Sequence, residues 1–527
     1  MIFPGHLSDG RGLVSDRTVN VRSSAWAGSW RRPATSGGAI SDTTTTTQPV
    51  DVDLLIGGEP IATTESFAVH DPAAPAETVG HAASATPEQA TAAVAAAWQA
   101  WTTWSATTAK DRAAQLVGAL DANADADAEE RARLLTRENG KVLGEAKIEL
   151  QVFAGRCRLA AELADRVDRT EDLKPPPFRS HVERLPLGVV TIIVPYNWPL
   201  AILAASLPYA LVAGNTVVVK PPPTTPLSVV TTLELLARGL PAGVLNVVTG
   251  SNEAVAPVIS DPRVSRIVFT GSTQAGRTIM KAAAENMTRV TLELGGNDAG
   301  IVLEDAQLDD AAIERLVVAS HLTTGQVCMG LKRLYVHRSR YDEVIDRMSE
   351  VLSAYIVGHG LDPEVTMGPL NSARQRDFVA ELKAEAADAG HEVREFGALH
   401  DQAERSGGHF LLPSLVLDPS PELRIVREEQ FGPALPVLPF DDENAAIAAV
   451  NDDWSGLCSS VWSADPQHAN DVAWRLRTGT TWINNHNAVA EDDRAPFGGF
   501  RLSGMGRELG ADGLLEFVEP HTITWHA

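Results

Sequence analysis

The sequence predicts an α/β protein built around a doubly wound parallel sheet. Its 527 residues, 44% of them hydrophobic, are enough for two or three domains that each bury a core. Beyond residue 50, short runs rich in β-branched residues alternate with longer amphipathic stretches. This alternation is typical of βαβ units, in which helices connect parallel strands.

The middle of the chain alternates most clearly. We expect strands over residues 189–194, 216–219, 245–248, 267–270 and 290–294. Between them we expect helices over 200–213, 227–238, 253–259 and 274–284. This order predicts a doubly wound, nucleotide-binding sheet. Upstream, apolar spacing and alanine content predict helices over 87–101 and 109–139.

A second α/β segment follows the first. We expect its helices near 309–320 and 341–355, and its strands near 333–337, 434–438 and 480–484. No linker rich in Pro or Gly separates the two segments cleanly. We therefore expect two closely packed domains, with the chemistry in a cleft between them.

Two stretches need a different interpretation. Residues 1–50 are rich in Ser, Thr, Gly and Arg and lack apolar periodicity, which predicts a disordered extension. Residues 185–219 carry no charge, but prolines and asparagines divide them into pieces too short to span a bilayer. We expect buried strands and helices there, and no membrane association.

Charge and cysteine content exclude several classes of protein. The formal net charge of −24 repels phosphate backbones, so nucleic acid is not an expected partner. Cys157, Cys328 and Cys458 are too few and too scattered for a disulfide framework or a zinc cluster. We expect no metal site. Three free thiols fit a reducing cytoplasm, and each is a candidate nucleophile.

Three polar side chains are placed where chemistry is possible. Cys328 follows a glycine turn at a helix end, where backbone amides can approach sulfur and an attached oxygen. Glu293 ends a predicted strand and precedes two glycines, and Asn197 lies on a proline-bounded loop after another strand. Taken singly, a buried inert cysteine, a salt-bridge carboxylate and a turn-forming asparagine are the commoner interpretations.

Two further features suit a dinucleotide. Residues 269–276 form a strand, a glycine turn and a helix start, where backbone amides and the Ser272 hydroxyl can meet a pyrophosphate. The segment is not a GxGxxG fingerprint, and a capped helix start is the simpler interpretation. Lys220 ends a predicted strand, where it can donate to ribose or phosphate, although most lysines are merely solvated.

The order and spacing of the motifs carry more information than each motif alone. They are PYNWP at 195–199, VVVKP at 217–221, FTGST at 269–273, LELGG at 292–296, GQVC at 325–328, EEQFGP at 428–433 and PFGG at 496–499. On these motifs the chain resembles the aldehyde dehydrogenase superfamily over roughly residues 52–525. It is most similar to a bacterial subgroup whose aldehydes are poorly defined.

The resemblance implies oxidation of an aldehyde to the carboxylic acid with NAD or NADP, through a thiohemiacetal and a thioester. Cys328 matches the nucleophile that attacks as a thiolate, Asn197 the oxyanion donor, and Glu293 the base that activates water. The matching cofactor contacts are Lys220 at the adenosine ribose, Ser272 at the pyrophosphate, Glu429 and Phe431 at the nicotinamide ribose, and Pro195, Tyr196, Gly271 and Leu294 nearby.

The resemblance also implies a domain layout. Residues 51–164 and 187–296 match a Rossmann-like, doubly wound NAD(P)-binding domain, and residues 297–504 match an α/β catalytic domain. Residues 165–186 and 505–527 match a small oligomerisation domain. A homodimer or homotetramer is therefore expected.

The chain departs from the family pattern at three positions. Pro223 occupies the place, three residues after the lysine, where many members carry a glutamate that excludes the 2′-phosphate of NADP. The choice between NAD and NADP is therefore open. Asn297 stands where a lysine is frequent, and we infer no loss of function from it. Arg494, in the loop matching the substrate tunnel, is a candidate for reading an acidic aldehyde, but a solvated charge is the favoured interpretation.

Two alternatives stay open on the sequence alone. One is a CoA-acylating semialdehyde dehydrogenase, a subclass that usually lacks the base that Glu293 matches. The other is a non-catalytic structural relative, against which the joint presence of Cys328, Glu293 and Asn197 argues.

Overall fold

Most strands of the first half of the chain form one large sheet, in which later strands are added on both sides of β8 (Val189–Ile193). The computed structural model describes residues 48–123, 127–174 and 178–526. The expected extension over 1–50 lies almost wholly outside these residues, although its last residue, Val50, already begins a strand.

The sheet has eight strands. Their order is β22 (Gly504–Met505), β12 (Arg289–Leu294), β11 (Val264–Gly271), β8 (Val189–Ile193), β9 (Thr216–Lys220), β10 (Leu245–Val247), β2 (Leu54–Ile56) and β3 (Glu59–Ile61). The five strands from β12 to β10 are parallel. Because the chain extends the sheet from β8 first toward β10 and later toward β12, the predicted doubly wound topology is confirmed.

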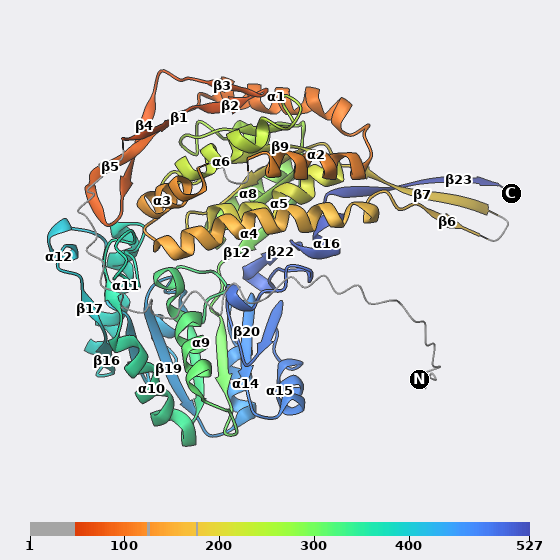
Figure 1. Ribbon diagram of the computed structural model, residues 1–527. Helices are drawn as coiled ribbons and strands as arrows, with labels where there is room; N and C mark the ends of the chain where they lie inside the picture. Colours follow the sequence, from red (N-terminus) through yellow and green to blue (C-terminus); the bar gives the residue numbers. More distant parts are fainter. Residues whose placement is uncertain (1–47, 124–126, 175–177, 527) are drawn as a thin grey trace. The chain divides into compact units, whose positions relative to one another are not determined.

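Helices connect the parallel strands and cover the sheet (Figure 1). The connecting helices are α5 (Pro199–Ala213), α6 (Leu227–Ala237), α7 (Pro257–Ser260) and α8 (Thr273–Glu285), and α1 (Pro87–Trp104) also packs against the sheet. The helix predicted over 253–259 was wrong in extent, since only a four-residue helix forms from Pro257. Proline has no backbone N–H, so the hydrogen bonds of a longer helix cannot continue through it.

The helix predicted over 109–139 is also divided. The structure has α2 (Ala109–Asp121) and α3 (Ala128–Asn139) instead. The Asn123 amide donates to the carbonyls of Ala119 and Leu235, and Asp127 adopts a left-handed conformation with φ of 50°. A left-handed residue interrupts the α-helical path, so α3 begins anew.

The long helix α4 (Leu143–Glu162) lies against α5, as Figure 1 shows. We did not predict it, because charged residues occupy its buried positions. Glu145, Glu149 and Arg156 are buried together with apolar residues, which hides the apolar periodicity.

A second sheet organises the other half of the chain. The order of its seven strands is β16 (Glu392–Glu395), β18 (Ser414–Leu417), β19 (Ala434–Phe440), β14 (Arg333–His337), β13 (Ala299–Val302), β20 (Cys458–Trp462) and β21 (Thr480–Ile483). All neighbouring strands are parallel except β16 and β18. The second α/β segment is therefore confirmed.

The remaining elements are shorter or flank the sheets. The helices are α9 (Asp310–His321), α10 (Tyr341–Ser353), α11 (Ala373–Asp388), α12 (Ala403–Ser406), α13 (Arg424–Arg427), α14 (Glu443–Asn451), α15 (Pro466–Ala473) and α16 (Gly510–Leu515). Two small sheets are formed by β1 (Val50–Val52), β5 (Ala74–Ala83) and β4 (Ser66–Asp71), and by β15 (Ile356–Val357) and β17 (Ala398–Leu399).

A three-stranded antiparallel sheet contains the end of the chain. In it β7 (Phe178–Pro186) pairs with β6 (Glu171–Leu173) on one side and with β23 (Val518–His526) on the other (Figure 1). Strands from both predicted oligomerisation segments thus pair here, and α16 contacts both α5 and β23. Across the described ranges 48–123, 127–174 and 178–526, no helix is both long and apolar enough to cross a membrane.

Candidate active site

The candidate residues lie where one edge of each sheet meets the other. Asn197, Lys220, Ser272 and Glu293 follow or end β8, β9, β11 and β12, so they share the carboxyl edge of the first sheet. Cys328 precedes β14 at the amino edge of the second sheet, and Glu429 similarly precedes β19. Two hydrogen bonds join the edges. Asn197 Nδ2 donates to the carbonyl of Gln326 (2.8 Å), and the Gly296 amide donates to Glu429 Oε1 (3.2 Å).

The turn that carries Cys328 has an unusual backbone. After α9, Thr323, Thr324 and Gly325 adopt left-handed conformations in succession, with φ of 50°, 58° and 72°. Glycine is required at the third position, because a Cβ there would lie 2.3 Å from the Gly432 carbonyl oxygen. The chain thereby reverses direction and presents Cys328, a half-buried free thiol.

The Asn197 loop is held from several sides. The Asn139 amide donates to the carbonyl of Tyr196 at 2.5 Å and, at 3.4 Å, to that of Asn197. The Asn197 side chain is 2% exposed, and its Oδ1 atom has no hydrogen-bond partner among the described residues. The orientation of this amide is therefore set by its one donated bond, which points toward the Cys328 turn.

Glu293 is buried, and within the described part of the chain neither of its carboxylate oxygens has a hydrogen-bond partner. Burial raises the pKa of Glu293 well above its ordinary value, and the carboxylate of Glu508 raises it further. Gly498 of the PFGG motif packs against it, since a Cβ there would lie 2.7 Å from Glu293 Oε1. A buried carboxyl without partners is suited to exchange a proton with a bound molecule.

The charges around the thiol oppose each other. Burial raises the pKa of Cys328 to about 12; Lys332 lowers it, while the carboxylates of Glu429, Asp298 and Glu293 raise it. Burial and the three carboxylates thus favour the neutral thiol, and Lys332 favours the thiolate. The base predicted from the sequence, Glu293, is one of the carboxylates that act on this pKa.

The residues predicted to contact the nicotinamide ribose, Glu429 and Phe431, precede β19. The Glu429 carboxylate lies over Gly295, where a Cβ would come within 2.1 Å of Oε2. Burial raises the pKa of Glu429 above its ordinary value, and Lys332 opposes that change. Phe431 has a left-handed backbone with φ of 47°, and its ring packs edge-on against Tyr196 at 6.2 Å between centroids.

The predicted adenosine and pyrophosphate contacts lie further along the same edge. Lys220 is buried, its pKa is lowered by burial, and its Nζ donates to Asn252 Oδ1 at 3.4 Å. Ser272 is the N-cap of α8 and accepts from the Ala275 amide, which agrees with the simpler interpretation of a capped helix start. Gly271 ends β11, and Leu294 ends β12, where it packs against α8.

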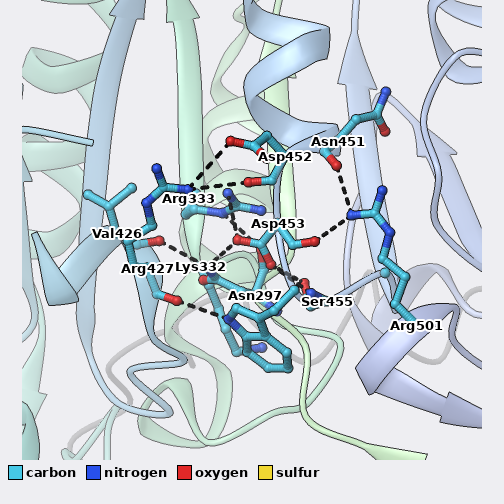
Figure 2. A network of polar contacts seen from close by, with 12 residues as sticks. Asn297, Lys332, Arg333, Val426, Arg427, Asn451, Asp452, Asp453, Ser455 and Arg501 are labelled. Atoms are coloured by element: carbon cyan, nitrogen blue, oxygen red, sulfur yellow. Dashed lines mark hydrogen bonds and ion pairs between the residues drawn. The ribbon is translucent and has the colours of Figure 1, made fainter. Parts of the chain in front are cut away.

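The segment after Glu293 is anchored by a buried polar network (Figure 2). Asn297 donates through Nδ2 to the Val426 carbonyl at 2.9 Å and to Asp453 Oδ2 at 3.1 Å. Arg333 lies 3.1 Å from the same Asp453 oxygen and donates to the Asn297 carbonyl at 2.9 Å. The asparagine that departs from the family pattern is therefore a structural link between the two sheets.

Several residues that hold the site were not predicted. On α4, Glu149 accepts from the amides of Leu200 and Ala201, next to the Asn197 loop, and Glu145 accepts from the Thr323 amide in the Cys328 turn. Lys332 donates to three carbonyls of that turn. Charged residues within an otherwise apolar helix were the available signal for the α4 carboxylates. Nothing in the local sequence distinguishes Lys332 from a solvated lysine.

Arg494 lies at the surface of the loop that matches the substrate tunnel. Its side chain is 80% exposed and is paired with Asp492. Arg156 is the buried arginine of this region, and it binds Glu491 and Asp493 of the same loop at 2.6 and 2.8 Å. The favoured interpretation of Arg494 as a solvated charge agrees with the structure.

The model of the aldehyde dehydrogenase family matches residues 61–523. The chain belongs to this family. It is 40% identical to the geranial dehydrogenase of Castellaniella defragrans over 398 residues, which cover 74% of this chain and 81% of that enzyme. It is 37% identical to the NADP⁺-dependent succinate-semialdehyde dehydrogenase of Escherichia coli over 391 residues, covering 74% and 80% of the two chains.

Solved structures agree. A point mutant of betaine aldehyde dehydrogenase from Staphylococcus aureus, in complex with NAD⁺ and with a modified cysteine, matches with a TM-score of 0.85 at 30% identity. The match covers 90% of this chain and 98% of that one. As a member of this family, the chain described here oxidises aldehydes to carboxylic acids with NAD⁺ or NADP⁺.

Proposed function

We propose that Cys328, Asn197 and Glu293 carry out the oxidation as nucleophile, oxyanion donor and general base. One observation carries this assignment. The two sheet edges bring the nucleophile turn within hydrogen-bond reach of the Asn197 amide, beside a buried carboxyl whose oxygens have no partner among the described residues. These are the groups that acyl transfer through a thioester requires.

The residues then act in sequence. Glu293 takes the thiol proton as Cys328 Sγ bonds to the carbonyl carbon of the aldehyde. The resulting oxyanion accepts hydrogen bonds from Asn197 Nδ2 and from the Cys328 amide. Bound NAD(P)⁺ supplies the hydride acceptor. Loss of the former aldehyde hydrogen as hydride to that acceptor converts the oxyanion to a thioester. Glu293 releases the thiol proton to solvent and then removes a proton from water as the water oxygen attacks the thioester. The C–S bond breaks, the acid leaves, and Glu293 returns the proton to Cys328 Sγ.

We also propose the cofactor contacts named from the sequence. Lys220 offers a buried cation at the end of β9 that suits the adenosine ribose. Gly271 ends β11, and Ser272 caps the 13-residue helix α8 that follows. Because β11 lies next to β8, this turn is at the reversal of strand order, where doubly wound sheets bind dinucleotides. Glu429 and Phe431 suit the nicotinamide ribose, with Pro195, Tyr196 and Leu294 forming the adjoining walls. The residues present fit a dinucleotide.

Two variants test the catalytic assignment. Cys328→Ser removes the nucleophile and should abolish NAD(P)H formation across a panel of aliphatic, aromatic and semialdehyde substrates. Glu293→Gln removes the proposed base from both proton transfers, so the thioester should form slowly and be hydrolysed slowly, with turnover lowered by about 10²–10⁴-fold. Intact-mass measurement detects the acyl adduct. Full oxidation by Cys328→Ser, or steady turnover by Glu293→Gln, contradicts the assignment.

The acceptor of the acyl group is tested at the same time. Because Glu293 is present and buried beside the thiol, we propose that water rather than CoA releases the product. Free acid should therefore appear at the full rate without CoA. A dependence of turnover on CoA would favour the acylating alternative, and inactivity on the whole panel would favour a non-catalytic relative.

We further propose a homodimer or homotetramer that uses the sheet of β6, β7 and β23. Leu185, Ile523 and Trp525 project from one face of that sheet and are 42%, 48% and 46% exposed. Light scattering should give the mass of a dimer or tetramer. Ile523→Glu should shift the distribution toward monomer, whereas Thr522→Glu, on the opposite face, should not. A monomeric wild type contradicts the proposal.

We infer a cytoplasmic location, which rests on Cys157, Cys328 and Cys458 all being free thiols. Fractionation of the producing cell should place the enzyme with cytoplasmic markers. Recovery with an oxidising compartment would contradict the inference.

A further inference from the structure

Lys332 makes an unusual set of contacts directly behind the nucleophile. Its Nζ donates to the carbonyl oxygens of Cys328 at 2.6 Å, Val327 at 2.8 Å and Gly330 at 3.1 Å. The side chain is 3% exposed. A neutral amine has two N–H donors and an ammonium has three. Three carbonyl acceptors therefore require the charged form of Lys332.

The same ammonium connects the nucleophile turn to the cofactor side of the site. Lys332 Nζ lies 3.6 Å from Glu429 Oε1, and Glu429 also accepts from the Gly296 amide. The backbone of Lys332 is fixed as well. Its amide donates to the Asp298 carbonyl at 2.9 Å, and its carbonyl accepts from the Gln430 side chain. The residue is therefore held at both its backbone and its side chain.

Several titratable groups surround Lys332 and Cys328. Glu293, Asp298 and Glu429 act on the pKa of the Cys328 thiol. Lys332 acts on the pKa values of Cys458 and His486. The three carboxylates all oppose ionisation of the thiol, and burial opposes it too. Lys332 is the group among these neighbours that favours the thiolate.

We propose that Lys332 is a positioning residue that fixes the Cys328 turn and maintains a positive charge between the nucleophile and Glu429, so that the thiolate forms within an otherwise anionic site. The proposal rests on the proposed role of Cys328. A purely structural lysine would need only the three carbonyl bonds. A charge that assists the nucleophile should also change how readily the thiol ionises.

The pH dependence of alkylation separates these roles without any turnover. Iodoacetamide reacts with thiolates, so the rate at which Cys328 is labelled, followed by peptide mass analysis of the ligand-free enzyme, reports its ionisation. In Lys332→Met the rate at pH 7.5 should fall about tenfold, the effect of one unit in thiol pKa. Lys332→Arg keeps the charge and should remain within about threefold of wild type.

Two further variants serve as an independent test and as a control. Glu429→Gln removes a carboxylate that opposes the thiolate, so labelling of Cys328 should become faster. Lys383→Met removes another largely buried lysine, which lies on α11 and is paired with Glu395 of β16, and should leave the labelling rate unchanged. If Lys332→Met does not accumulate as folded protein, Glu429→Gln decides the outcome, because unchanged or slower labelling overturns the proposal.

Failure of the Lys332 proposal can be distinguished from failure of the proposed role of Cys328. If Cys328→Ser is inactive but Lys332→Met labels at the wild-type rate, Cys328 stays the nucleophile and the Lys332 proposal fails. If Cys328→Ser keeps oxidising aldehydes, the proposed function fails, whatever the labelling shows.

Discussion

The side-chain amide of Asn197 donates a 2.8 Å hydrogen bond to the backbone carbonyl of Gln326, two residues before Cys328. This bond orients the amide toward the nucleophile turn before any substrate binds. Oxyanion donors act by being fixed in advance, because no reorganisation is then needed as charge develops. The bond therefore explains how residues 129 positions apart can form one site.

Asn197→Ala should lower kcat by about 10²–10³-fold, the effect of losing one oxyanion donor. The reason is loss of charge stabilisation at the oxyanion, not loss of the nucleophile. Steady-state kinetics measures the decrease, and iodoacetamide labelling of Cys328 serves as the control, since it should continue at a rate near that of wild type. A variant that retained most of its kcat would show that the Asn197 loop has another role.

Glu508 should control the acid limb of the pH profile. It is buried, its pKa is raised to about 7 by burial, and its carboxylate raises the pKa of Glu293. Glu293 acts as a base only when ionised, so turnover falls as pH drops below its pKa. Removing the Glu508 charge makes ionisation of Glu293 easier. Glu508→Gln should therefore move the acid limb of kcat to lower pH.

The matched control for this shift is Glu404→Gln, an exposed carboxylate on α12. It should leave the profile in place. Because Glu508 accepts a hydrogen bond from Ser206, thermal unfolding of both variants should be followed in parallel. An acid limb that stays fixed or moves to higher pH in folded Glu508→Gln would exclude the coupling.

The sequence was informative where local pattern determines structure. The runs that end at Lys220 and Glu293 are apolar and β-branched, and both form parallel strands that deliver the expected side chain to one sheet edge. Gly325 was predicted as a turn, and only glycine fits its backbone next to Gly432. Such features depend on a few consecutive residues and could be read directly.

Long-range contacts could not be read in the same way. The helix α4 was missed because Glu145 and Glu149 occupy buried positions. The amides that bind them come from the first turn of α5 and from the Cys328 turn, both distant in sequence. The interpretation of a lysine as solvated is a sound default, yet Lys332 is buried by a fold that brings Glu429 beside it. Tertiary burial decides such cases, and a single sequence does not specify it.

The buried pair of Lys141 and Glu149 should be a main source of stability for the Asn197 loop. Both side chains are fully buried, Glu149 accepts from the amides of Leu200 and Ala201, and Lys141 lies 3.9 Å above the Trp198 ring. Glu149→Gln leaves the lysine charge buried without its counter-charge. The free energy of unfolding should fall by about 3–5 kcal/mol.

Denaturant unfolding followed by tryptophan fluorescence measures this loss. The control is Glu129→Gln, which breaks the solvent-exposed pair of Glu129 and Lys147 and should change the free energy by less than about 1 kcal/mol. Equal effects from the two variants would show that the buried pair is not specially stabilising.

Pro223 should leave the enzyme permissive toward NADP⁺. It is exposed and lies three residues after Lys220, the residue proposed to meet the adenosine ribose. A carboxylate at this position would repel a 2′-phosphate, and like charges in close contact are strongly unfavourable. Pro223→Glu should therefore lower kcat/KM for NADP⁺ by at least about tenfold relative to that for NAD⁺. Pro223→Gln, which adds a side chain of similar size without charge, should change the ratio much less.

The measurement is kcat/KM for both cofactors at low ionic strength, where screening is weak. A wild-type enzyme that already rejects NADP⁺, or a Pro223→Glu variant whose cofactor ratio is unchanged, would mean that another residue discriminates between the two cofactors.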